Sequence, residues 1–131
     1  MADSTILNLD LQTTGANAGT WGSKTNDNLE KVENAIKGYK AVSVATSGTL
    51  ALTTASGGTG DEQSRASLKL EGSLSGNVAL ECEANPYWYF IHDASTRGGY
   101  TLTFGPAGGT ALTLPYTNTK YLVYTDGTTM F

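Results

Sequence analysis

The chain has 131 residues, with 12 acidic and 8 basic side chains and a formal net charge of -4 at pH 7. The sequence pI of about 4.7 excludes the basic surface that attracts a phosphate backbone, so we expect no nucleic-acid partner. No stretch approaches the roughly 20 apolar residues of a membrane-spanning helix, so we expect no membrane partner. A single cysteine, Cys82, excludes an internal disulfide.

Aliphatic side chains are scarce. Leu, Ile, Val and Phe together number 25, whereas the chain has 16 Gly and 20 Thr. Seven Tyr and two Trp add apolar area, and the weak net charge argues against disorder. Small domains bury a small fraction of their surface, and association is a common remedy. We therefore expect an ordered domain whose thin core is completed by a partner.

The first 22 residues are polar and dotted with glycine, apart from one apolar patch. In this patch Leu7, Leu9 and Leu11 alternate with polar residues, which predicts a short strand. The following residues, 14–22, hold three glycines and predict an ordered loop around Trp21.

One segment has helical periodicity. Leu29, Val32 and Ile36 recur at i, i+3 and i+7, which predicts a helix over residues 25–37 with one narrow apolar stripe. A helix of about 13 residues is marginal on its own, so the stripe must dock on something. We expect Leu9, Leu11, Trp21 and the stripe to make an oligomer or attachment contact.

The ends of this helix carry the usual signals. Thr25 or Asn26 is placed to cap the start, and Asp27 follows in the first turn, where the helix dipole favours acids. Gly38 is placed to end the helix in a left-handed conformation. The face opposite the stripe, with Lys31, is compatible with solvent.

Beyond residue 38 the hydrophobic period changes to 2. Turn signals about ten residues apart are typical of an antiparallel β-sandwich or barrel. The sequence therefore predicts a mainly β chain, with residues 1–38 as an N-terminal arm and helix and residues 39–131 as the β-sandwich domain. The expected strands are Lys40–Thr46, Thr49–Thr54, Ser67–Glu71, Asn77–Glu83, Tyr87–His92, Tyr100–Phe104, Thr110–Leu114 and Lys120–Tyr124. Residues 55–65 are expected to form a surface loop.

Two of these strands are apolar on both faces, namely residues 87–91 and 121–124. A strand of this kind is covered on both sides, and in a small domain the second cover is plausibly another subunit. Aromatic faces also stack on sugar rings, so a host surface glycan is a second possible partner. The candidate interface or glycan-stacking residues are Tyr87, Trp88, Tyr89, Phe90 and Tyr121. Alternation places Trp88, Phe90 and His92 on one face.

The sequence offers little for catalysis. One His and one Cys are too few for a zinc site, and the acids are scattered. A Cys82/His92 dyad is outweighed by the interpretation of Cys82 as a core residue and His92 as a strand end. We expect no enzymatic activity, no cofactor and no metal.

Two segments carry distinctive residue patterns. The first spans residues 9–38, and its pattern consists of Gly15, Asn17, Gly19, Trp21, Gly22, Asn26, Asn28, Leu29, Ile36 and Gly38. The second, β-rich segment spans residues 72–129, and its pattern consists of Gly72, Leu74, Gly76, Asn77, Val78, the run Gly99–Thr103, and Tyr124, Asp126, Gly127 and Thr128. At these positions both segments resemble bacteriophage tail-fibre and virion structural proteins of the marine-phage type.

The resemblance implies a non-enzymatic component of a virion, assembled in the host bacterial cytoplasm and usually a homotrimer that contacts other virion proteins. Proteins of this type are often much longer, with distal repeats and a receptor-binding tip. Because this chain is too short for both, we expect neither a long shaft nor a receptor-binding tip. The sequence is therefore interpreted as a short tail fibre or fibre adaptor that attaches through its N-terminal segment. A capsid decoration or cement protein, a head fibre and a carbohydrate-binding β-sandwich module are the alternatives.

Overall fold

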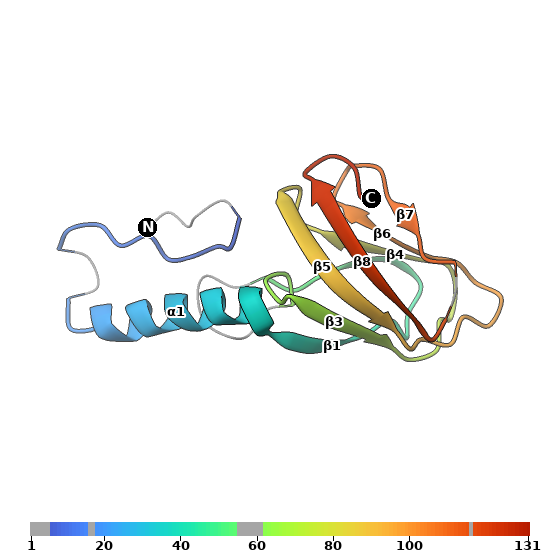
Figure 1. Cartoon of the computed structure of the whole chain (residues 1–131), viewed down its shortest axis with the longest axis horizontal. Coiled ribbons are helices and arrows are strands. Elements are labelled where there is room, and N and C mark those ends of the chain that lie inside the picture. The colour runs from blue at the N-terminus through green and yellow to red at the C-terminus, as the bar shows by residue number, and fades with distance from the viewer. Residues whose placement is uncertain (1–5, 16–17, 55–61, 116) are drawn as a thin grey trace.

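The computed structural model describes residues 6–15, 18–54, 62–115 and 117–131 (Figure 1). Within these ranges a single helix, α1 (Trp21–Lys37), projects from a β domain of two four-stranded sheets, ordered β1-β3-β5-β8 and β2-β4-β6-β7. The expected mainly β chain, with two β layers and one helix, is confirmed. The strands are β1 (Tyr39–Ser43), β2 (Gly48–Ala51), β3 (Ser67–Glu71), β4 (Val78–Cys82), β5 (Pro86–Asp93), β6 (Leu102–Pro106), β7 (Leu112–Thr113) and β8 (Thr119–Asp126).

Strand direction differs from the expectation. Strands β1 to β6 alternate between the two sheets, so each of β1 to β4 pairs with the strand two places later. The pairs β1–β3, β3–β5, β2–β4 and β4–β6 are all parallel. The antiparallel prediction was wrong for these four pairs because each connection between β1 and β6 carries the chain across to the opposite sheet instead of back along the same one. Only β7 and β8 pair antiparallel, with β6 and β5.

The β domain is therefore a short, flattened solenoid with two strands in each coil. Parallel register stacks like side chains into ladders that line the space between the sheets. One ladder consists of Leu50, Leu80, Phe104 and Leu112. All four belong to the core or pack against it. Each such side chain contributes about 1.5–3 kcal/mol when fully buried, so a chain poor in aliphatic residues can still close a core.

A buried ion pair closes the turn after β5. Asp93 is fully buried, and its carboxylate accepts hydrogen bonds from the backbone N–H (3.1 Å) and hydroxyl (2.6 Å) of Ser95. Arg97 pairs with the same carboxylate and also donates to the carbonyl oxygen of Leu114 at 2.6 Å. The pair thereby joins the last coil to the segment that follows β7.

The helix begins earlier than its periodicity predicts. It starts at Trp21, with Thr20 at the N-cap and no side-chain capping bond. The capping role predicted for Thr25 or Asn26 was wrong, and so was the position of Asp27 in the first turn, which contains no acid. The predicted loop around Trp21 is helical from Trp21 onward, because tertiary contacts further along the helix support its first turn.

Gly38 ends the helix in another way than predicted. Its backbone is extended, with φ -70° and ψ 151°, so no left-handed turn forms. Its N–H donates to the carbonyl oxygen of Asn34 at 2.7 Å. A Cβ atom at residue 38 would lie 2.4 Å from that oxygen. Glycine is therefore required here by close backbone approach, and the chain passes straight from α1 into β1.

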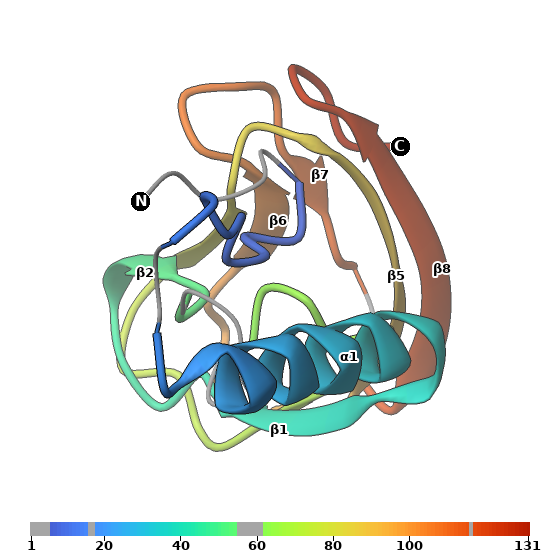
Figure 2. The same cartoon turned by 90° about the vertical axis from the view of Figure 1, so that its left-hand side faces the viewer.

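The arm before the helix is not a strand. Leu7, Leu9 and Leu11 do not pair with a sheet, and only Asp10 forms an isolated bridge. Figure 2 shows the arm crossing the end of the β domain above α1. Its contacts there are polar: Asn8 Nδ2 lies 3.1 Å from both carboxylate oxygens of Glu83. Asn17 and residues 55–61 lie outside the described residues.

The end of the predicted loop 55–65 differs from the expectation. Gln63 and Ser64 are buried because they lie under the arm and β5. Gln63 Oε1 accepts a hydrogen bond from the backbone N–H of Glu83 at 3.0 Å, whereas its buried Nε2 makes no hydrogen bond to the described residues. This part of the segment belongs to the interior.

Replacing Gly38 with alanine tests the close approach. We expect Gly38→Ala to lower the free energy of unfolding by roughly 1–3 kcal/mol, because the new methyl group must displace the Asn34 carbonyl. Gly22→Ala is the matched control, since its Cβ would meet nothing within 4 Å and alanine favours a helix by about 1 kcal/mol. Urea unfolding measures both, and equal stabilities would contradict the role of Gly38.

Candidate interaction surfaces

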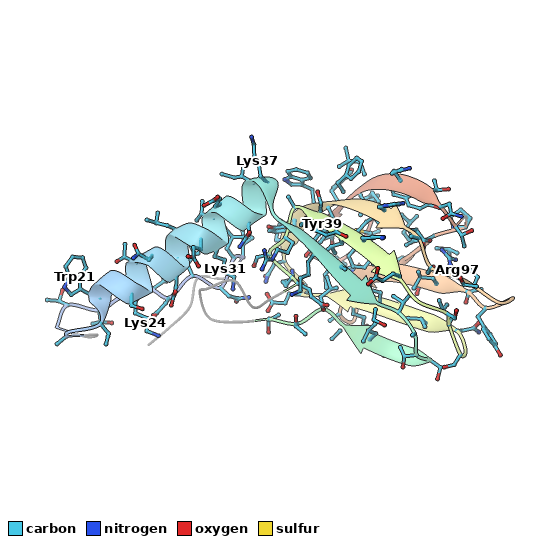
Figure 3. The ribbon with its side chains drawn as sticks, turned by 90° about the horizontal axis from the view of Figure 1, so that it is seen from below. Trp21, Lys24, Lys31, Lys37, Tyr39 and Arg97 are labelled. Carbon is cyan, nitrogen blue, oxygen red and sulfur yellow. The ribbon has the colours of Figure 1, made fainter. Side chains whose placement is uncertain are left out.

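Two groups of large apolar side chains are exposed on the described part of the chain. The first, the helix stripe, consists of Trp21, Leu29, Val32 and Ile36 on α1. Trp21, Leu29 and Ile36 are 65%, 61% and 66% exposed, and Val32 is half-buried. The second, the outer β face, consists of Trp88, Phe90, Leu122, Tyr124 and Phe131, all exposed. Tyr39 lies between the helix and the sheet (Figure 3).

The helix faces its own chain with its polar side. The side-chain amide of Asn28 bonds both backbone groups of Asp10, accepting from its N–H at 2.8 Å and donating to its carbonyl oxygen at 2.9 Å. Lys24 Nζ lies 3.7 Å from the Asp10 carboxylate, and Lys31 is fully buried. The solvent-compatible face predicted around Lys31 was wrong, because this face holds the arm.

The orientation of α1 leaves its stripe uncovered within the chain. The carbonyl oxygen of Asn34 accepts a hydrogen bond from the backbone N–H of Ala66 at 3.1 Å, which attaches the helix to the start of β3. Figure 3 shows Lys24 and Lys31 on one side of α1 and Lys37 on the other. Rotating the helix to bury Leu29 and Ile36 would break the bonds of Asn28 and expel the buried Lys31. The apolar stripe therefore stays open.

Alternation along β5 divides its aromatic residues as predicted. Trp88, Phe90 and His92 face outward, whereas Tyr89 and Ile91 are fully buried. The neighbouring β8 has the same pattern, with Leu122 and Tyr124 outside and Val123 inside.

Register then groups the outward side chains into rows. Trp88 is paired with Tyr124 and Phe90 with Leu122, so the apolar residues form two adjacent rows across two strands. The ring of Phe131 stacks on that of Tyr124, with centroids 5.0 Å apart. The outer β face is thus a continuous patch on a rigid antiparallel pair.

Of the proposed interface residues, Tyr89 belongs to the interior, and Tyr87 and Tyr121 pack partly against the core. Tyr89 is fully buried and donates to the carbonyl oxygen of Gln63 at 2.7 Å, and Tyr87 donates to that of Ser64 at 2.8 Å. The rings of Tyr87 and Tyr89 lie 4.9 Å apart, and Tyr121 packs against the core. Tyr89 is therefore closed to a sugar or a subunit, whereas Tyr87 and Tyr121 are half-buried and keep part of their surface exposed.

The two arm residues predicted as contacts, Leu9 and Leu11, differ in exposure. Leu11 is exposed, whereas Leu9 is half-buried. Because the arm is bound through polar groups of Asn8 and Asp10, its leucines play a small part in holding it. Leu11 therefore remains available for contact with a partner, and Leu9 only in part.

The Cys82/His92 dyad does not form. Cys82 is buried in β4, whereas His92 lies on the outward side of β5 in the other sheet. Burial raises the pKa of the Cys82 thiol to about 11, so the thiol is protonated at neutral pH. A cavity of about 240 Å³ beside it is lined by Leu52, Glu81 and Glu83 among others.

Within the described ranges, no group of three or more His, Cys, Asp or Glu side chains is placed to hold a metal ion. The one helix there, α1, is too short and too polar to cross a membrane. No family model, curated protein or solved structure matches the chain.

Neighbouring residues of β5 provide a test of the two faces. Tyr89→Ala should lower the free energy of unfolding by about 3–5 kcal/mol, because it empties part of the core and leaves the Gln63 carbonyl unpaired. Trp88→Ala, one residue away and half exposed, should cost less than about 1 kcal/mol. Thermal or urea unfolding of the two variants measures the difference, and a larger loss for Trp88→Ala would contradict the assigned orientation.

Proposed function

We propose that the chain is a non-enzymatic structural protein of a bacteriophage particle, a short tail fibre or fibre adaptor that assembles as a homotrimer. One observation carries the self-association: α1 binds its own chain with its polar side and exposes an apolar stripe. An exposed apolar surface of this kind on a small domain marks an interaction site. The stripe has no covering segment among the described residues.

The assignment to a phage particle is supported by the sequence resemblance, and the structure divides its shared positions into two groups. Asn28 and Gly38 hold the helix, since one binds the arm and the other permits the close approach to Asn34. The second group, Trp21, Leu29 and Ile36, is exposed and does not hold the helix to its own chain. A pattern that combines internal anchors with exposed apolar residues suits a segment used for attachment.

The architecture of the β domain is compatible with this proposal. Stacked coils contact only their neighbours, so the fold grows along one axis. Such a fold suits an elongated particle component. The same stacking also suits a head fibre or a capsid decoration protein, so the location on the particle needs a separate measurement.

Mass in solution tests the self-association. We expect light scattering to give three times the 13.7 kDa mass of the chain, because covering the stripe removes apolar surface from water. Leu29→Lys with Ile36→Lys should dissociate the assembly, since both side chains are exposed and can carry charge in the monomer. A control, Glu81→Lys on the opposite sheet, should keep the assembled mass. A monomeric parent chain would refute the proposal.

Antibody labelling of phage particles in electron micrographs tests the location. Label confined to the tail supports a fibre or adaptor, because such proteins attach at the tail. Label spread over the head would replace this assignment with a decoration protein or head fibre. Particles that carry no label would overturn the virion assignment altogether.

A carbohydrate-binding module is the second candidate, and one observation favours it. Trp88 and Tyr124 are register partners with exposed rings, which is the kind of surface that stacks on sugars. Tyr89, named with Trp88 as a platform, is buried and cannot take part. Loss of glycan binding in the folded Trp88→Ala variant would favour this function, whereas binding that persists would exclude this surface.

A further inference from the structure

The proposed self-association leaves open what the helix stripe packs against. We propose that the helix stripe of one copy lies on the outer β face of a neighbouring copy, in a head-to-tail arrangement. This inference rests on the proposed function and names its interface. The two surfaces are the largest exposed apolar groups on the described part of the chain, and each lacks a cover.

The chain's own helix does not reach its own outer β face. Figure 1 shows α1 projecting away from the β domain, and its polar side is held by Asp10 and Ala66. The end of β1 nearest the helix carries Tyr39, which is in the same register row as Ser67 and Phe90. A helix that covers this row must therefore come from another copy.

Packing of the stripe against a second stripe is less favourable. Its apolar residues from Trp21 to Ile36 span about two heptads, whereas coiled coils need about three or four. Glu30 and Glu33 are exposed at its edge. Pairing helices would bring these acids of neighbouring copies together. Two of the three lysines that could offset them, Lys24 and Lys31, are engaged by the chain itself.

One end of the outer β face has the complementary charge, whereas the other end carries the exposed acid Asp126. The apolar row of Phe90 and Leu122 lies beside the row of His92 and Lys120, and Lys120 is exposed. A helix whose stripe covers Phe90 and Leu122 brings Glu30 and Glu33 toward this lysine. Charge complementarity of this kind sets the orientation of a docked helix more than its affinity.

The dimensions of the two surfaces agree. Leu29 and Ile36 are separated by roughly 10 Å along the helix axis. Outward rows recur about every 7 Å along a strand, and neighbouring strands lie about 4.8 Å apart. The two rows on β5 and β8, extended by Phe131, therefore form an open apolar face of similar extent on which the helix can lie.

The head-to-tail arrangement also limits the number of copies in the assembly. Stripe and face are different surfaces, so the contact is heterologous, and it closes into a ring when the rotation between copies allows. A closed ring of three copies would cover every stripe and every outer β face, which agrees with the proposed trimer.

Cross-linking between two single variants tests the inference. Leu29→Cys and Leu122→Cys chains, one carrying a mass tag, are mixed, reassembled and treated with a short bis-maleimide. We expect cross-linked pairs of mixed mass only, because Leu29 of one copy lies against Leu122 of the next. Cys82 is buried and its thiol protonated, so the parent chain is the control and should not react.

The other outcomes are distinct. Cross-links between two Leu29→Cys chains would show helix-on-helix packing and overturn the inference. An assembly of full mass without cross-links would also overturn it, because the outer β face would then be free for another occupant such as a glycan. In both cases the proposed self-association survives. A monomeric parent chain would refute that self-association itself.

Charge reversal supplies a second readout. Lys120→Glu should weaken the assembly about threefold to tenfold, since it faces acids across the interface. Adding Glu30→Lys and Glu33→Lys to the same chain should restore most of the lost affinity. Glu81→Lys on the opposite sheet is the matched control and should have no effect. Sedimentation equilibrium measures the dissociation constants, and a triple variant weaker than Lys120→Glu alone would overturn the inference.

Discussion

The hydrogen bonds that hold α1 to its own chain decide what the rest of the molecule can offer. Asn28 binds both backbone groups of Asp10, and the carbonyl of Asn34 accepts from Gly38 and Ala66. These contacts use the polar side of the helix. Because a helix cannot turn two faces to the same neighbour, the apolar stripe must point away. Leu29 and Ile36 are thus exposed because backbone N–H and C=O groups on the other side of the helix must form hydrogen bonds.

The β domain forms a continuous core from few aliphatic residues because its coils stack on one another. Parallel register places inward residues of successive coils above one another, so a few side chains in each coil line a continuous core. The aromatic residues of β5 take part through Tyr89, whose ring lies 5.4 Å from that of Phe104. The inward half of the aromatic strand completes the core of its own chain, and only the outward half is left for a partner.

The proposed role as a particle component rests on the apolar surface that the single chain leaves exposed. The core is closed, the helix is attached, and two apolar surfaces are still exposed. Neither surface carries a cluster of acids, histidines or cysteines that would suggest a reaction at that place. The proposed assembly would bury this apolar area between copies.

Much of the secondary structure could be predicted from the sequence. Each of the eight expected strands overlaps an observed one, and Ser67–Glu71 agrees at both ends. The outward orientation of Trp88, Phe90 and His92 followed from alternation alone, because the side-chain period of a strand is local. The helix stripe was equally visible, since a spacing of three and four residues needs no tertiary information.

Other features depended on contacts between distant residues. Strand direction was set by turns that cross between sheets, and no local pattern distinguishes such a turn from a hairpin. The early start of the helix, the extended backbone of Gly38 and the burial of Lys31 all depend on the arm and on residues 62–66. The sequence by itself determined which faces are apolar. Only the tertiary structure decided which are covered, because burial depends on the segments that pack together.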